Sequence, residues 1–137
     1  MGKSVAVVVP ALVLDAIFES ARRLYPKETI LLLRGKKDKD VIHVEELVVP
    51  PLATYGYGFA NIPLSMLPID FSIVGTVHSH PSGSLVPSVV DFNNFFGRIL
   101  MIAAFPFADE QDVAVYNARG ERLLLKIMRQ DAYSCSR

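Results

Sequence analysis

The sequence predicts a mixed α+β fold, with one curved, mixed β-sheet flanked by helices. Helical and strand patterns alternate in the first third of the chain, whereas strand patterns dominate the last third. The chain has 137 residues and is 51% hydrophobic, so it can bury roughly two-thirds of its unfolded surface around one core. We therefore expect a single domain over residues 1–129 and a polar tail over residues 130–137.

The N-terminal residues predict a strand, a helix and a β-hairpin. The β-branched run SVAVVVP is typical of a buried strand, and Pro10 can open the helix that follows. Pro26 disfavours helical backbone at Tyr25, so the helix should end there. Residues 28–35 and 41–49 then predict two strands joined by the charged turn GKKDKD. The expected apolar face of the helix consists of Leu12, Ala16, Ile17, Ala21 and Leu24.

The second half of the chain predicts a buried strand, a short helix and three further strands. The run FSIVGTVHSH is apolar up to its last residues, and SVVDFNNFFGR has a helical pattern. The strand-like runs ILMIAAF, DVAVYN and RLLLKI follow, the last two joined at NARG. Between the two halves, residues 51–70 interleave glycine and proline with aromatic residues, and we expect a long loop with a short helical piece there.

Composition narrows the classes of function. Lys plus Arg and Asp plus Glu number 14 each, so there is no basic excess that would indicate a nucleic-acid partner. The single cysteine, Cys135, excludes an intrachain disulfide and a thiolate metal cluster and fits a cytoplasmic location. The apolar run near the start is interrupted by Pro10 and is shorter than the ~20 residues of a membrane helix, so we expect no membrane span and no targeting segment.

A group of polar residues stands out at residues 78–91. His78 and His80 alternate on one strand, so both imidazoles point to the same face, with their residues about 6.6 Å apart. Pro81 ends the strand, and Asp91 in the first turn of the next helix can return a carboxylate to the same place. Two imidazoles and one carboxylate with no fourth ligand are the pattern of an open catalytic zinc site.

A structural explanation competes with this interpretation. Ser88 and Asp91, three residues apart and followed by apolar residues, match a helix capping box that needs no metal. A His-x-His pair alone is also weak support for a metal site, because histidines at strand ends are usually exposed or hydrogen-bonded. The combination favours a functional site. Both histidines lie at the end of a buried strand, a proline turns the chain directly after them, and the carboxylate lies where the next helix starts. Ser88 can cap the helix and still face the metal.

These residues resemble the JAMM motif of the MPN+ (JAB1/MPN/Mov34) metalloproteases, and the chain is most similar to compact, single-domain archaeal members. His78-Ser79-His80-Pro81, the seven residues from Pro81 to Pro87, and Ser88-x-x-Asp91 match it at every fixed position. The resemblance implies the cytidine-deaminase-like MPN fold. It also implies an upstream glutamate in a Pro-x-Glu setting, which is Glu28. Glu45 and Glu46 are the competing candidates, expected as solvated or ion-paired residues on a sheet edge.

The resemblance implies zinc-dependent hydrolysis of an isopeptide or peptide bond. His78, His80 and Asp91 would then hold one Zn²⁺ per chain, and Glu28 would act as general base and then general acid. Ser88 would donate a hydrogen bond to the oxyanion. Ser79 points to the opposite face from the histidines, and we expect it to contribute packing or a hydrogen bond behind the ligands.

The implied partners are ubiquitin-like modifier proteins and their conjugates, with no nucleic acid or membrane. The sequence is also compatible with a homodimer. Tyr55, Tyr57 and Phe59 lie in a segment, residues 53–67, that could receive an extended substrate tail. Processing of sulfur-carrier C-termini, a noncatalytic MPN scaffold and a two-histidine, one-carboxylate iron oxygenase remain alternatives. A zinc nucleobase deaminase does not, because it would need a Pro-Cys-x-x-Cys pair that one cysteine cannot supply.

Overall fold

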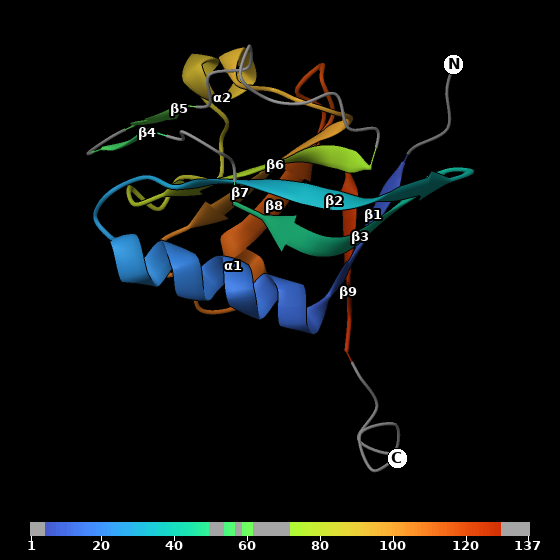
Figure 1. Ribbon diagram of the computed structural model, residues 1–137, viewed down its shortest axis with the longest axis horizontal. Helices are drawn as coiled ribbons and strands as arrows, with labels where there is room; N and C mark the ends of the chain where they lie inside the picture. Colours follow the sequence, from blue (N-terminus) through green and yellow to red (C-terminus); the bar gives the residue numbers. More distant parts are fainter. Residues whose placement is uncertain (1–4, 50–53, 57–58, 62–71, 130–137) are drawn as a thin grey trace.

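The computed structural model describes residues 5–49, 54–56, 59–61 and 72–129 (Figure 1). Two α-helices lie in these residues, α1 (Ala11–Leu24) and α2 (Val89–Asn93), together with a 3₁₀ turn at Glu110–Asp112. No helix within these ranges is long and apolar enough to cross a membrane. The strands are β1 (Ala6–Pro10), β2 (Ile30–Asp38), β3 (Val41–Val48), β4 (Thr54–Gly56), β5 (Phe59–Asn61), β6 (Ile73–His80), β7 (Ile99–Ala104), β8 (Val113–Tyr116) and β9 (Leu124–Met128).

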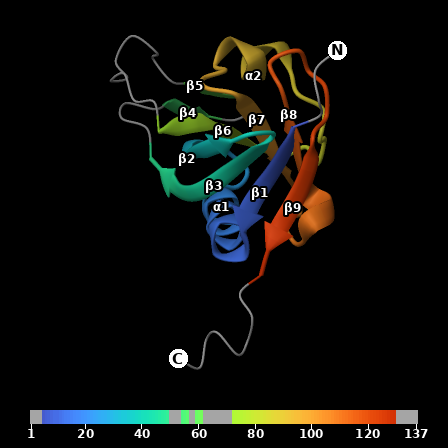
Figure 2. The same cartoon turned by 90° about the vertical axis from the view of Figure 1, so that its right-hand side faces the viewer.

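Seven of the strands form one mixed sheet in the order β8-β7-β6-β2-β3-β1-β9. The pairs β1–β3, β1–β9 and β6–β7 are parallel, whereas β2–β3, β2–β6 and β7–β8 are antiparallel. The two ends of the sheet curl toward each other, because the amide of Leu123, just before β9, donates to the carbonyl of Val115 in β8. Figure 2 shows this twisted, curved sheet with α1 against it, which confirms the predicted fold class.

Helix α1 covers one face of the sheet and forms the main core with it. Pro10 precedes the helix and Tyr25 follows its last residue, as the two prolines predict. The predicted apolar face is partly wrong, because Leu12 is 72% exposed and Ala16 and Leu24 are exposed as well. The helix instead buries the stripe Val13, Leu14, Ile17, Phe18 and Ala21. That stripe follows the 3.6-residue period more closely and contains the bulkier side chains.

The other face of the sheet carries two smaller apolar clusters. Ile30 and Leu32 of β2 belong to the first of them, and Leu100 and Ile102 of β7 belong to the second. Phenylalanines in and after α2 pack against both clusters. Helix α2 and the separate β4–β5 hairpin lie on the side of the sheet away from α1 (Figures 1 and 2). Among the described residues, the elements that cover this face are short.

Two further expectations about local structure need correction. The charged segment GKKDKD is not all turn, because β2 continues to Asp38, which pairs with Val41. Only residues 39 and 40 form the turn, and Lys39 adopts a positive φ of 57°. Within residues 51–70, the chain forms the β4–β5 hairpin with Tyr55 opposite Ala60, where we expected a loop. The expected helical piece of that loop lies outside the described residues.

Candidate active site

Strand β6 places two histidines in the interior of the protein. Every residue of the strand is buried, because β2 and β7 flank it and both faces of the sheet are covered there. His78 and His80 alternate with Ser79, so the two imidazoles share the face toward α2. His78 is completely inaccessible to solvent and His80 is 7% exposed. Buried imidazoles at the end of a central strand require polar partners, because an unsatisfied buried polar group is costly.

The N-terminus of α2 supplies a carboxylate to the same place. The Ser88 hydroxyl accepts from the amide of Asp91, at 3.2 Å, and Asp91 Oδ2 accepts from the amide of Ser88, at 2.7 Å. This reciprocal pair is a capping box, which fixes the start of the helix and the direction of the carboxylate. The side chain of Asp91 is only 2% exposed. The capping prediction is therefore correct, and the cap itself aims Asp91 at β6.

The two carboxylate oxygens of Asp91 face the two histidines. Oδ1 lies 3.1 Å from Nδ1 of His78, and Oδ2 lies 2.9 Å from Nε2 of His80. On the far side of the His80 ring, Nδ1 lies 2.8 Å from the carbonyl oxygen of Ser84. A carbonyl can only accept, so Nδ1 of His80 carries a proton. In neutral His80, Nε2 then directs a lone pair at the carboxylate, an arrangement that needs a cation or a second proton between them.

The surroundings of His78 independently indicate the same need for a cation or a proton. Its Nδ1 is close to Asp91, but the pair lacks hydrogen-bond geometry, so both ring nitrogens are without a hydrogen-bond partner among the described residues. An imidazole that is fully buried and unsatisfied is rare in folded proteins. Imidazole nitrogens and a carboxylate are donors that a divalent cation such as zinc accepts. Within the described residues, however, no three His, Cys, Asp or Glu side chains are spaced to hold a metal ion, so the donor types of His78, His80 and Asp91, rather than their present spacing, suggest a cation here.

The charges of the site are strongly coupled. Burial acts to raise the pKa of Asp91, but the imidazoles of His78 and His80 and the Ser88 amide hold that pKa well below its usual range. Burial acts to lower the pKa of His80, but the hydrogen bond and charge of Asp91 outweigh it and raise the pKa. The site thus stabilises an anionic carboxylate and attracts positive charge, whether that charge is a proton or a metal ion.

Glu28 lies across the sheet from His80. Ile30 of β2 pairs with His78, and continuing this antiparallel register by two residues places Glu28 opposite His80 on the same face. Glu28 is half-buried, and this burial raises its pKa. The charges of His80, Asp91 and His78 also act on Glu28, in that order of strength. The structure therefore brings Glu28, which only the resemblance had singled out, to the histidine and aspartate group.

The site contains one contact that the sequence did not indicate. The Ser84 carbonyl orients the His80 ring, and Ser84 lies in the loop between β6 and α2. A backbone carbonyl leaves no signature in the residue type, so sequence patterns could not have found it. Ser88 is exposed beside the carboxylate, and its hydroxyl accepts from Asp91, which leaves the hydroxyl hydrogen for a further acceptor.

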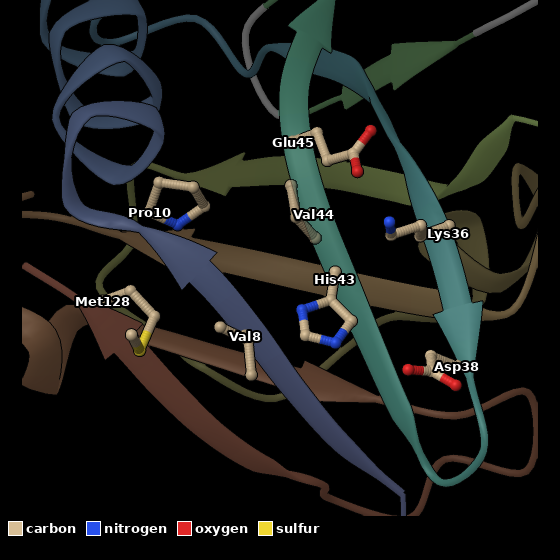
Figure 3. A pocket seen from close by; sticks show the side chains of 8 residues that line it. All are labelled: Val8, Pro10, Lys36, Asp38, His43, Val44, Glu45 and Met128. Carbon is tan, nitrogen blue, oxygen red and sulfur yellow. The ribbon is translucent and has the colours of Figure 1, made fainter.

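The competing glutamates lie elsewhere. Glu46 pairs with Arg34 at 2.7 Å, as expected for an ion-paired residue. Glu45 lines a separate surface hollow of about 600 Å³ with His43 and Lys36, formed by β1, β2, β3 and β9 (Figure 3). Strand β3 lies between β2 and β1 in the sheet, but its pairing with β1 ends at His43, so Glu45 and Glu46 are flanked by β2 alone, as expected for a sheet edge. The third histidine, His43, therefore belongs to this hollow rather than to the site.

The proposed substrate segment is described only in part. Tyr55 lies in β4 and Phe59 in β5, and the register sets Gly56 opposite Phe59. Tyr57 lies outside the described residues. The hairpin is on the same side of the main sheet as α2 (Figure 1), so it is on the side of the sheet that carries the histidines.

Comparison with known proteins agrees with this geometry. Residues 10–118 match the family described as prokaryotic homologs of the JAB domain. A probable metalloprotease of Haloferax volcanii is 30% identical over 126 residues, covering 86% of this chain and 77% of the relative.

Two solved structures extend the comparison to the fold. A JAB1/MPN domain protein of Archaeoglobus fulgidus is 35% identical, with a TM-score of 0.64 over 88% of this chain and 97% of that protein. A structure described as JAMM, a metalloprotease-like zinc site in the proteasome and signalosome, is 31% identical, with a TM-score of 0.64 over 90% of this chain and 98% of that protein. The chain therefore belongs to the prokaryotic JAB (JAMM) metalloprotease family and has the MPN fold.

Proposed function

We propose that this protein is a zinc-dependent peptidase that cleaves ubiquitin-like modifiers from conjugated lysines or from linear fusions. The observation that carries the proposal is the position of Glu28, which faces a buried cluster of two imidazoles and one carboxylate from across the sheet. A metal-binding cluster alone is compatible with a structural role. A half-buried carboxylate beside it adds a group that can take up and release a proton.

The choice of zinc rests on the donor set and on the family. Two imidazole nitrogens and one carboxylate are a common set for catalytic zinc, which leaves one position open. The same set occurs in non-haem iron oxygenases, so donor chemistry alone does not separate the two metals. A solved relative with 31% identity is described by its zinc site, which supports zinc here.

The protein's own residues divide the chemistry among them. Zinc, when bound, supplies Lewis-acid activation of water and of the scissile carbonyl. Glu28 takes the proton of the attacking water and later delivers it to the leaving amine, and its raised pKa suits both transfers. Ser88 donates its hydroxyl hydrogen to the oxygen of the tetrahedral intermediate. The Ser84 carbonyl holds the His80 ring, which keeps Nε2 directed into the site.

The β4–β5 hairpin supports the substrate class. A protease that releases a modifier must hold the extended tail that precedes the cleaved bond, and an exposed strand edge can bind such a tail by main-chain hydrogen bonds. The hairpin pairs only with itself among the described residues, since β4 and β5 form a separate two-stranded sheet. In this proposal, Tyr55, Tyr57 and Phe59 provide apolar contacts along the tail.

The substrate class can be tested with a panel of defined conjugates. The protein is incubated with an isopeptide-linked conjugate, a linear fusion of the same modifier, and an unrelated unfolded protein, and the products are identified by mass spectrometry. We expect a cut directly after the modifier's C-terminal residue in one or both modifier substrates. Cleavage of the unrelated protein at many sites, with the modifier bonds intact, would contradict the proposal.

The metal assignment predicts which histidines retain zinc. His80→Ala removes one of three protein ligands, so we expect zinc content to fall from one per chain to a small fraction and cleavage to be lost. His43→Ala is the matched control, because His43 lines the separate hollow on β1, β2, β3 and β9. Elemental analysis of both variants, purified without added metal, gives the answer. Stoichiometric iron in place of zinc in the unmodified protein would overturn the zinc assignment.

Glu28→Gln separates proton transfer from metal binding. The amide keeps the size of the side chain but cannot accept the proton, so turnover should fall by about 10²- to 10⁴-fold while zinc content stays unchanged. Glu45→Gln and Glu46→Gln are controls on β3 and should keep near-normal turnover. The assignment of the base fails if Glu28→Gln cleaves at the normal rate.

The hairpin predicts a change in substrate binding rather than in chemistry. Replacing Tyr57 and Phe59 with serine removes contacts that are remote from the cleaved bond, so KM for a modifier-linked substrate should rise more than kcat falls. Steady-state kinetics with conjugates of one modifier measure both constants. Unchanged kinetics in the double variant would eliminate the docking role of the hairpin.

A further inference from the structure

A buried pair of hydroxyl residues lies directly behind the site, on the sheet face toward α1. Thr29 precedes β2, and Ser79 lies between the two histidines of β6. Thr29 is 4% and Ser79 2% exposed. The Ser79 hydroxyl oxygen lies 2.8 Å from the Thr29 amide and 3.1 Å from the Thr29 hydroxyl, and the Ser79 amide donates to the Thr29 carbonyl at 3.0 Å.

This contact replaces one bond of the β-ladder with a side chain. In an antiparallel sheet, two directly opposed residues of a hydrogen-bonded pair exchange two amide-to-carbonyl bonds. Ser79 and Thr29 keep one of them, from the Ser79 amide. The other amide, of Thr29, donates to the hydroxyl of Ser79. The side chain of Ser79 therefore determines where the Thr29 amide points.

The amide held in this way belongs to the peptide group that joins Glu28 to Thr29. Its orientation sets the ψ angle of Glu28 and hence the direction from which the Glu28 side chain leaves the backbone. Glu28 lies before the first residue of β2, at an isolated β-bridge position, so the continuous β2–β6 ladder ends beside it. The bond from Thr29 to Ser79 is the nearest constraint after Glu28 in the chain.

We propose that Ser79 is a positioning residue that holds Glu28 over the metal site by fixing the Glu28–Thr29 peptide group. The inference rests on the proposed role of Glu28 as proton carrier. Packing alone does not account for a hydroxyl here, because the core on this face is apolar apart from Thr29, and the neighbour of Ser79 across the parallel ladder is Ala103. Strand β6 thus serves the site with both of its faces, metal ligands on one and the support of the base on the other.

Ser79→Ala removes the acceptor of the Thr29 amide. With a modifier-linked substrate, we expect kcat to fall about 10- to 100-fold, since a displacement of about 1 Å can cost that much, with KM and zinc content near normal. Ser79→Thr keeps the hydroxyl and should restore most of kcat. Ser79→Cys fills the same space with a weak acceptor and should resemble Ser79→Ala, which guards against a folding defect in the alanine variant.

Thr29→Val is the matched control. It removes the hydroxyl-to-hydroxyl contact but keeps the amide that donates to Ser79, so its kcat should stay within about two-fold of normal. Loss of zinc in Ser79→Ala, or an equal loss of kcat in Thr29→Val, would show that the pair acts only in folding or metal binding, and would overturn the proposal.

Amide hydrogen exchange supplies a readout that needs no activity. The Thr29 amide should exchange faster in Ser79→Ala than in the unmodified protein, while amides in the middle of β6 keep their protection. Unchanged exchange at Thr29 would overturn the proposal even in an active enzyme. Faster exchange at Thr29 in a protein that cleaves no modifier substrate would support the positioning role of Ser79 and would count against the proposed function instead.

Discussion

The Asp91 carboxylate is the constraint on which the site depends. Its oxygens bond the amide that starts α2 and, at the same time, face the imidazoles of His78 and His80. An anionic carboxylate is buried here at a cost that only these partners offset. The helix start, the orientation of both histidines and the path of the connecting loop are consequently coupled, because moving any of them leaves the carboxylate unsatisfied. The helix cap and the proposed metal site, which the sequence presents as alternatives, would use the same carboxylate.

The local parts of this arrangement could be predicted from the sequence. Alternation along an apolar strand places His78 and His80 on one face, and the spacing from Ser88 to Asp91 indicates a helix start. Both features depend only on residues that are close to one another in the sequence. The buried face of α1 was mispredicted for a different reason. Several apolar residues are available on that helix, and contact with the sheet selects Val13, Leu14 and Phe18 over Leu12 and Leu24.

The non-local parts could not be predicted from patterns alone. Glu28 reaches the site only because β2 pairs with β6, a strand more than 30 residues later in the chain, as well as with its hairpin partner β3. No periodicity in the sequence encodes this pairing, and the family resemblance supplied Glu28 instead. The position of Glu45 is a second example. It lies at an irregularity of strand pairing, where the β2–β3 register passes from Glu46 to Val44, and no local pattern in the sequence predicts that irregularity.

The central strand explains why a small domain can keep such a site rigid. Strand β6 is buried along its whole length, and at Gly75 its backbone approaches β7 so closely that an added Cβ would lie 2.2 Å from the Ile99 carbonyl oxygen. Because His78 and His80 lie on one strand that is buried along its whole length, their spacing is set by the sheet. Asp91 lies on a five-residue helix and Glu28 lies just before the start of a strand, so neither is carried by a long regular element. Each is restrained by a serine: Ser88 caps the helix that carries Asp91, and Ser79 accepts from the amide that follows Glu28. Because both restraining serines lie within or beside the histidine and aspartate pattern, that pattern encodes the supports of the site together with its reactive groups.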